Sequence, residues 1–334
     1  MLHTIKLTII FALFLFFSLV AQSLKIATYN IYFLDDGISS ERKHNLQTVI
    51  RELDADVIAF QEIKNPAALE NILTPNYGIA MIDDSAEVQE VALAVRIPFG
   101  IKSYSYIFPD TLFDDAFPRT RDLLQVEVEA FDRDFYFLVH HFKSRSGGRR
   151  QTDERRNSAS ILIVKHIRRN LAGQNVILLG DFNDNPDDRT LNILEYGSSD
   201  APAGIDEVED TFLYNTSEAL VEMDYCSWGY NYHFNEIQGD TFDLAIAGSR
   251  AENNKWRDRD YDYWKDVTIK EILFDQILVS MNLKSFVKKI GILNTASAVQ
   301  GTPSKARFTD YGVEYPRRGS FASDHLPVWV LIEF

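Results

Sequence analysis

The middle of the chain reads Val176-Ile177-Leu178-Leu179-Gly180-Asp181-Phe182-Asn183-Asp184, an apolar run followed at once by acid and amide side chains. Near the C-terminus, Ser323-Asp324-His325-Leu326-Pro327-Val328 places an acid and a histidine just before a second apolar run that ends at Ile332. Such runs indicate buried strands. Carboxylate and amide oxygens beside them suit a hard divalent cation such as Mg2+, whose usual partner in a substrate is phosphate. The two stretches therefore indicate metal-assisted phosphoryl chemistry.

Four further strings have the same form, a strand that carries polar side chains at or near its end. They are Lys25 to Asn30, Asp56 to Glu62, Asp134 to Ser144 with His141 and Lys143, and Ile272 to Ser280 with Asp275. Taken singly, each has a simpler explanation. An Asp or Asn after a strand is often a turn residue or a helix N-cap. A lone histidine on a strand is more often a core residue than a catalyst.

In this order, the six strings resemble the endonuclease/exonuclease/phosphatase superfamily, the group of deoxyribonuclease I and the apurinic-site endonucleases. The matching pieces are Thr28-Tyr29-Asn30-Ile31, Gln61-Glu62-Ile63, His141-Phe142-Lys143-Ser144, Gly180-Asp181-Phe182-Asn183, Asp275-Gln276-Ile277-Leu278-Val279-Ser280 and Ser323-Asp324-His325-Leu326-Pro327-Val328. They run from Thr28 to Val328 and so cover nearly all of the chain after its N-terminal segment. Gly-Asp-Phe-Asn or Ser-Asp-His alone would be a weak signal, whereas the ordered set is specific.

The chain alternates predicted strands with predicted helices. We expect strands at residues 24–33, 56–61, 90–96, 123–129, 135–140, 176–179, 276–280 and 328–334, and helices at 41–53, 152–171 and 189–196. This pattern predicts two sheets packed face to face with helices outside. The resemblance implies the superfamily's α/β fold, a four-layered α/β sandwich of two mixed β-sheets with the site at one edge. No repeat or linker interrupts residues 24–334, so we expect one domain there.

The resemblance also implies which residues bind the metal and activate water. Glu62 and Asp324 would bind the catalytic cation, with Asn30 beside them through its amide oxygen. Mg2+ is the expected ion, and Mn2+ or Ca2+ could take its place. Asp181 would orient or deprotonate the attacking water, and Asn183 would hold that water or the phosphate by hydrogen bonds. Metal and phosphate both assist such a deprotonation.

The histidines would act on the phosphate. The resemblance implies that His141 and His325 bracket the scissile phosphate and stabilise the charge on its oxygens. Asp275 would accept a ring N–H of His325 and so fix its tautomer and favour its charged form. Three further phosphate-side charges have weaker motif support: Arg121, Lys143 and Arg149.

One position departs from the apurinic-site endonucleases. Those enzymes place an acid two residues after the first-strand asparagine, whereas this chain has Tyr32 there. The difference puts a second metal position and an abasic-site activity in doubt. His141 stands where those enzymes use a tyrosine, which looks like the deoxyribonuclease I arrangement.

The N-terminus reads as a targeting segment. Residues 1–7 carry one lysine and no acid, residues 8–20 are almost wholly apolar, and small residues follow at Ala21 and Ser23. This pattern predicts a signal peptide over residues 1–23, cleaved near Ala21 or Ser23, and the apolar run is short for a membrane-spanning helix. We therefore expect a secreted or periplasmic protein. Cys226 is the only cysteine, so no intramolecular disulfide can form.

Charge and composition limit the class of partner. The chain has 46% apolar and 25% charged residues, as ordinary globular proteins do, and a net charge of −15. That balance argues against holding nucleic acid by bulk charge. From Lys143 to Arg156, however, the sequence contains six basic and two acidic residues, which gives a local charge of +4. This stretch is either a solvated helix start or a positive rim that guides a polyanion to the metal.

Residues 225–264 contain many aromatic residues among charges. The rings could pin a long loop to the core, stack on bases, or enter a membrane interface. Membrane contact is the less favoured reading, because the segment is too charged to match the apolar, aromatic-tipped hairpin of sphingomyelinases.

The leading hypothesis is a secreted, Mg2+-dependent nuclease that hydrolyses extracellular DNA or RNA. It would act as a monomer, with nucleic acid as its substrate and no stable protein partner. A phosphatase or phospholipase of the same superfamily, acting on phosphoinositides or sphingomyelin, is the alternative. A binding protein that has lost catalysis would need a missing site residue, and none of the eight well-supported ones is missing. Fold alone does not choose among these substrates.

Overall fold

The computed structural model describes residues 22–84, 89–118, 122–145, 149–204, 209–222, 225, 227–229, 271–293, 307–309, 312–314 and 322–334. The predicted signal segment up to Ala21, Cys226 and nearly all of the aromatic-rich segment lie outside these residues. No helix within the described part of the chain is long and apolar enough to cross a membrane.

Two six-stranded mixed sheets form the centre of the molecule, and the α/β sandwich predicted for the chain is confirmed. The first sheet has the order β13 (Val287–Ile292), β16 (Val328–Glu333), β1 (Ser23–Leu34), β2 (Val57–Ile63), β4 (Glu90–Arg96), β3 (Tyr77–Met81). The second has the order β5 (Gly100–Tyr106), β6 (Leu124–Ala130), β7 (Arg133–His141), β8 (Asn175–Asp181), β12 (Asp275–Ser280), β9 (Leu213–Asn215). Each sheet holds one parallel pair, β1 with β2 and β7 with β8.

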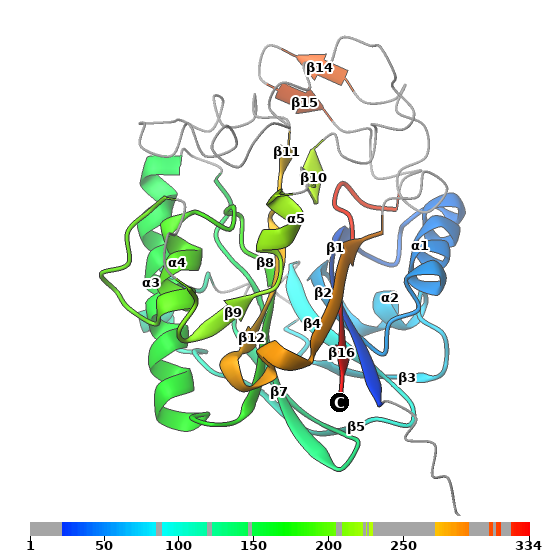
Figure 1. Cartoon of the computed structure of the whole chain (residues 1–334). Coiled ribbons are helices and arrows are strands. Elements are labelled where there is room, and N and C mark those ends of the chain that lie inside the picture. The colour runs from blue at the N-terminus through cyan, green and yellow to red at the C-terminus, as the bar shows by residue number, and fades with distance from the viewer. Residues whose placement is uncertain are drawn as a thin grey trace, which may run out of the picture.

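Helices cover the outer faces of the two sheets (Figure 1). On one side lie α1 (Ser40–Leu53) and α2 (Pro66–Glu70), and on the other lie α3 (Arg149–Asn170) and α4 (Arg189–Tyr196). The remaining elements among the described residues are short: α5 (Glu218–Glu222), two 3-10 turns (Thr111–Phe113 and Met281–Phe286), and two strand pairs, β10 (Trp228–Gly229) with β11 (Glu271–Ile272) and β14 (Arg307–Thr309) with β15 (Gly312–Glu314).

Alternation along the central strands builds the layered core. In β2, Val57 and Ala59 belong to the cluster between the sheets, whereas Ile58 and Phe60 pack on the side of α1. Successive side chains of a strand point to opposite faces, so a strand buried on both faces must be apolar at every position. This requirement accounts for the uninterrupted apolar runs in the sequence.

Strand register brings strand ends from both sheets to one edge of the sandwich, which we call the rim. The parallel pairs end together, with Asn30 beside Gln61 in one sheet and His141 beside Asp181 in the other. The antiparallel strand β12 begins at Asp275, which is paired with Asp181. The site residues therefore lie on strand ends and adjoining loops at one edge of the sandwich, as the resemblance implied.

Candidate active site

Glu62 and Asn30 come from neighbouring strands of the first sheet and contact each other. Asn30 donates from Nδ2 to Glu62 Oε1 at 3.2 Å and to Asp181 Oδ2 at 3.0 Å. Its amide oxygen accepts from the backbone N–H of Tyr32 at 3.0 Å. The nitrogen of Asn30, and not the oxygen expected from the sequence, thus faces the two carboxylates. The structure gives Asn30 the role of linking Glu62 to Asp181 across the two sheets.

Left-handed backbone conformations shape this part of the rim. Glu62 has φ 64°, and Tyr32 and Phe33 have φ 51° and 50°. Such conformations are uncommon for residues other than glycine and persist where surrounding contacts hold them. Phe33 donates its N–H to Glu62 Oε2 at 3.1 Å, which ties the two turns together. Arg42 of α1 is fully buried and donates to the carbonyls of Ile31 and Tyr32.

The loop before β16 brings Asp324 and His325 to the same place. Ser323 donates from Oγ to the carbonyl of Asn30 at 2.6 Å and accepts from the N–H of His325 at 3.1 Å. Arg42 also donates to the carbonyl of Ala322, so one buried guanidinium holds both the Asn30 turn and this loop. The serine of the Ser-Asp-His string therefore has a structural function, which is to fix the loop on β1.

Asp324 and Glu62 fit a hard cation. No group of three or more His, Cys, Asp or Glu side chains within the described residues forms a ready metal cluster. However, Asp324 Oδ1 is buried and has no hydrogen-bond partner among those residues, and burial raises the pKa of this carboxyl group. A bound cation would satisfy that oxygen and stabilise its charge. Mg2+ commonly binds through one or two carboxylates and completes its shell with water and phosphate.

Asp181 lies at the centre of the site. Its Oδ2 is 3.4 Å from His141 Nε2 and 3.9 Å from His325 Nε2, and its Oδ1 accepts from the N–H of Asn183 at 2.8 Å. Burial raises the pKa of Asp181 to about 7, against the opposing effect of His325. A carboxylate that has a raised pKa and lies beside two histidines is suited to accept a proton from water.

His325 and Asp275 form a buried pair. His325 Nδ1 lies 2.7 Å from Asp275 Oδ2. Burial alone would lower the pKa of His325, but the carboxylates of Asp275, Asp324 and Asp181 together raise it to about 10. Asp275 itself is anchored because its N–H donates to Ser227 Oγ at 2.9 Å. His325 is therefore charged at neutral pH, with Nε2 directed toward Asp181.

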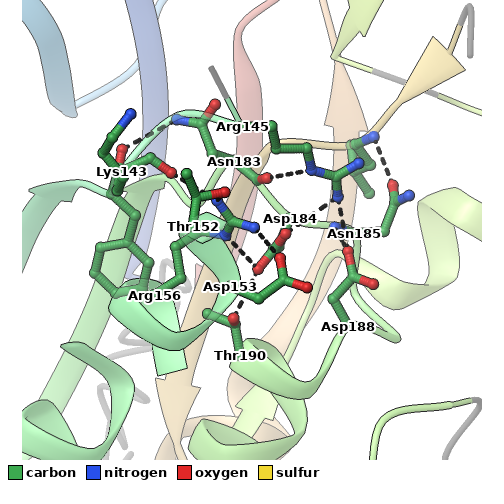
Figure 2. A network of polar contacts seen from close by, with 12 residues as sticks. Lys143, Arg145, Thr152, Asp153, Arg156, Asn183, Asp184, Asn185, Asp188 and Thr190 are labelled. Atoms are coloured by element: carbon green, nitrogen blue, oxygen red, sulfur yellow. Dashed lines mark hydrogen bonds and ion pairs between the residues drawn. The ribbon is translucent and has the colours of Figure 1, made fainter. Parts of the chain in front are cut away.

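Asn183 belongs to a network of buried polar contacts that the sequence analysis did not identify (Figure 2). Its Nδ2 donates to the carbonyl of Phe142 at 3.1 Å, and its own carbonyl accepts from Arg145 Nε at 2.8 Å. Arg145 and Arg156 share the carboxylate of Asp184, which Arg145 reaches at 3.1 Å and Arg156 at 2.7 Å. The only available signal in the sequence was the position of Arg145 directly after the His-Phe-Lys-Ser string.

Of the two readings of residues 143–156, the positive rim is not supported at three of the six basic residues. Arg145 is 3% exposed and Arg156 is fully buried, and both are paired with acids. Arg155 donates to the carbonyls of Asp114 and Asp115. At least these three charges hold the loops together instead of facing a polyanion. The local net charge of +4 does not by itself indicate a positive surface, because side chains that are close in sequence contact different partners.

The three weaker phosphate-side candidates are placed only in part. Lys143 is half-buried at the rim, and its Nζ donates to the carbonyl and hydroxyl oxygens of Ser144 at 3.1 and 3.2 Å. Arg149 is the first residue of α3, and only its backbone is described. Arg121 lies outside the described residues.

Comparisons with known proteins show the family and the fold of this chain. A model of the Endonuclease/Exonuclease/phosphatase family matches residues 27–325. The fold is similar to D. rerio TDP2 complexed with a single-strand DNA product, with 17% identity, a TM-score of 0.56, and coverage of 92% of this chain and 98% of that one. No match was found among curated proteins.

Two other solved structures are similar. One is an endonuclease/exonuclease/phosphatase family protein from Bacteroides thetaiotaomicron, with 16% identity, a TM-score of 0.58, and coverage of 94% of this chain and 98% of that one. The other is the human Nocturnin catalytic domain with bound sulfate, with 13% identity, a TM-score of 0.51, and coverage of 93% and 95%.

Proposed function

The chain belongs to the Endonuclease/Exonuclease/phosphatase family, and from that premise we propose that it is a divalent-metal-dependent phosphodiesterase that hydrolyses extracellular DNA or RNA. One observation carries the proposal. The Oδ2 atom of Asp181 lies 3.4 Å and 3.9 Å from the Nε2 atoms of two histidines, beside the carboxylate of Glu62 that Asn30 connects to it. A proton acceptor, two histidines and an acid that could bind a cation thus meet at one point.

The side chains have separate tasks in this proposal. Asp181 accepts the proton of the attacking water as that water approaches phosphorus. His325, held protonated by Asp275, donates a hydrogen bond to a phosphate oxygen on which charge develops, and His141 acts from the other side. Asn183 is fixed by Phe142 and orients water or phosphate. Each donor is in place before the reaction, so little reorganisation is required in the transition state.

Glu62 and Asp324 would hold Mg2+, or Mn2+ or Ca2+ in its place. When bound, such a cation supplies positive charge to the phosphate oxygens and to the leaving oxygen. Asn30 would then orient Glu62 by its hydrogen bond, because its amide nitrogen faces the carboxylates of Glu62 and Asp181.

Nucleic acid is the substrate class best supported. His141 matches the deoxyribonuclease I pattern. D. rerio TDP2, which has a similar fold, has been solved in complex with a single-strand DNA product. The net charge of −15 requires the enzyme to contact phosphate locally, through histidines and a metal, instead of by a broad basic surface. Export follows from the signal peptide predicted over residues 1–23, and the proposed enzyme acts as a monomer without a stable protein partner.

Hydrolysis assays test the proposal. The purified protein would be incubated with plasmid DNA, single-stranded RNA, a chromogenic phosphodiester, a chromogenic phosphomonoester and sphingomyelin vesicles, with Mg2+ or with EDTA. We expect metal-dependent cleavage of nucleic acid, lost in Asp181→Asn and retained in Asp132→Asn, which removes an exposed acid at the opposite end of β7. Intact nucleic acid together with cleaved lipid or phosphomonoester would replace the proposal with the phospholipase or phosphatase alternative. N-terminal sequencing of exported protein tests cleavage near Ala21 or Ser23.

A further inference from the structure

We infer that Arg145 is a positioning residue that locks Asn183 onto the segment carrying His141, and thereby sets the distance between the two loops of the second sheet. The inference rests on the proposed function for its catalytic consequence. Its structural part stands on contacts among described residues.

Arg145 contacts three separate pieces of the rim. It lies in the loop after β7, donates from Nε to the carbonyl of Asn183 at 2.8 Å, and donates from Nη2 to Asp188 Oδ2 at 2.8 Å. Its guanidinium lies 5.2 Å from the ring centroid of Phe274, the residue before Asp275. Figure 2 shows the bonds of Arg145 to Asn183 and Asp188, and with the Phe274 contact this one buried side chain connects the loops after β7 and β8 with the residue before β12.

Asn183 depends on contacts from outside its own loop. Its φ of 54° is left-handed, a conformation that persists where neighbours hold it. Its side chain donates to Phe142 and its carbonyl accepts from Arg145, and both partners follow His141 closely in sequence. These two bonds connect the loop after β8 to the loop after β7. Losing the Arg145 bond would free the carbonyl side of Asn183 and loosen the N–H that it donates to Asp181 Oδ1.

The buried polar network around Arg145 fixes the positions of the side chains that it connects. Asp184 divides its carboxylate, with Oδ1 on Arg145 and Oδ2 on both Arg156 and Thr190. All of these side chains are buried. Buried ion pairs often add little net stability compared with apolar packing. We therefore assign this network the other function that such pairs can have, which is to specify one geometry. A lysine keeps the charge but lacks the planar fork that reaches several acceptors at once.

The test is a double-mutant cycle on turnover of the chromogenic phosphodiester. Arg145→Lys should lower kcat by about 10- to 100-fold, because small displacements of catalytic groups have effects of this size. KM and the Mg2+ concentration for half-maximal activity should stay within about twofold, since Arg145 contacts neither predicted metal ligand. In an Asn183→Ala background, Arg145→Lys should lower kcat by no more than about twofold, because the Asn183 side chain that the Arg145 bond positions is already absent. Asp188→Asn keeps the shape of the Asp188 side chain but removes the charge that pairs with Arg145. This variant should show the same pattern to a smaller extent.

Arg189→Lys is the matched control. Arg189 begins α4 in the same segment, but it donates to the carbonyls of Ala201 and Ser199, away from the rim. We expect wild-type kcat for this variant. Equal loss of kcat from Arg145→Lys in both backgrounds, or no loss in the wild-type background, would overturn the inference.

Hydrogen exchange separates failure of this inference from failure of the proposed function. Arg145→Lys should speed exchange at the amides of Asn183 and Asn185, which donate to Asp181 Oδ1 and Asp188 Oδ2, and Arg189→Lys should not. If the wild-type protein cleaves no phosphodiester, the proposed function fails while this comparison still decides whether Arg145 holds the loop. Unchanged exchange in Arg145→Lys would refute the inference.

Discussion

The Nδ1 atom of His325 lies 2.7 Å from Oδ2 of Asp275, and both side chains are buried. The two residues are 50 positions apart, and their contact joins the loop before β16 of the first sheet to the start of β12 in the second sheet. Asp275 Oδ1 has no hydrogen-bond partner among the described residues. The carboxylate is thus committed to the imidazole, whose charge and orientation it sets.

Asp275→Asn should lower kcat strongly. The amide keeps the shape of the carboxylate but cannot stabilise an imidazolium, so His325 would lose both its charge and its fixed tautomer. In buried carboxylate–histidine pairs of hydrolases, the corresponding change costs up to about 10,000-fold, and we expect at least about 100-fold here. The measurement is kcat at neutral pH with saturating Mg2+, with Asp132→Asn as the control. A loss below about threefold would contradict a catalytic role for the pair.

The same pair should make the metal-free protein less stable at alkaline pH. The pKa of His325 is raised from 6.5 to about 10, so the folded state binds the proton more tightly than the unfolded state. The stabilisation is therefore complete below pH 6.5 and is lost as pH rises through about 10, and it has an upper bound of about 5 kcal/mol. Urea unfolding in EDTA at several pH values measures this effect. The difference in free energy of unfolding between wild type and Asp275→Asn should shrink across that range, and a constant difference would refute the assignment.

Glu62→Gln and Asp324→Asn should weaken metal binding. Each substitution removes one negative charge and one strong oxygen ligand, so we expect the Mg2+ concentration for half-maximal activity to rise by about 10-fold or more. Titration of the apo protein with Mg2+ by calorimetry provides a readout independent of turnover. Asp132→Asn, which removes an acid far from the rim, should bind Mg2+ as the wild type does. Unaltered affinity in both site variants would show that the cation binds elsewhere.

Gly180→Ala should destabilise the protein severely. A Cβ atom at Gly180 would lie 2.0 Å from the carbonyl oxygen of His140, and the backbone φ of 152° disfavours a side chain there. Because the contact is with backbone of the adjacent parallel strand, the strand itself would have to move, at a cost above about 4 kcal/mol. Thermal unfolding measures the loss. Gly100→Ala is the control, since nothing lies within 4 Å of a Cβ atom at that position.

Much of the architecture could be predicted from local patterns. The helix expected at residues 189–196 matches α4, and the helix expected at 41–53 begins one residue earlier, at Ser40, after the N-cap residue Ser39. Strands β3, β5 and β13 were not expected. Residues 100–106 are mostly exposed and carry polar side chains, so they lack the apolar run that identifies a buried strand. Pairing with β6 makes that segment a strand, and such pairing is not visible in local sequence.

The order of motif residues along the chain was enough to establish the family and to propose its site, because each motif couples a buried strand with the side chains at its end. The roles of individual atoms depended on contacts between distant residues. Asn30 meets Asp181 across 151 positions, and Ser323 meets Asn30 across 293. Which atom of Asn30 faces the carboxylates, and whether Arg145 faces solvent or the interior, follow from the packing of two sheets against each other. Neighbours in the sequence do not settle these points, since a polar group taken from water must find its partner wherever the fold supplies one.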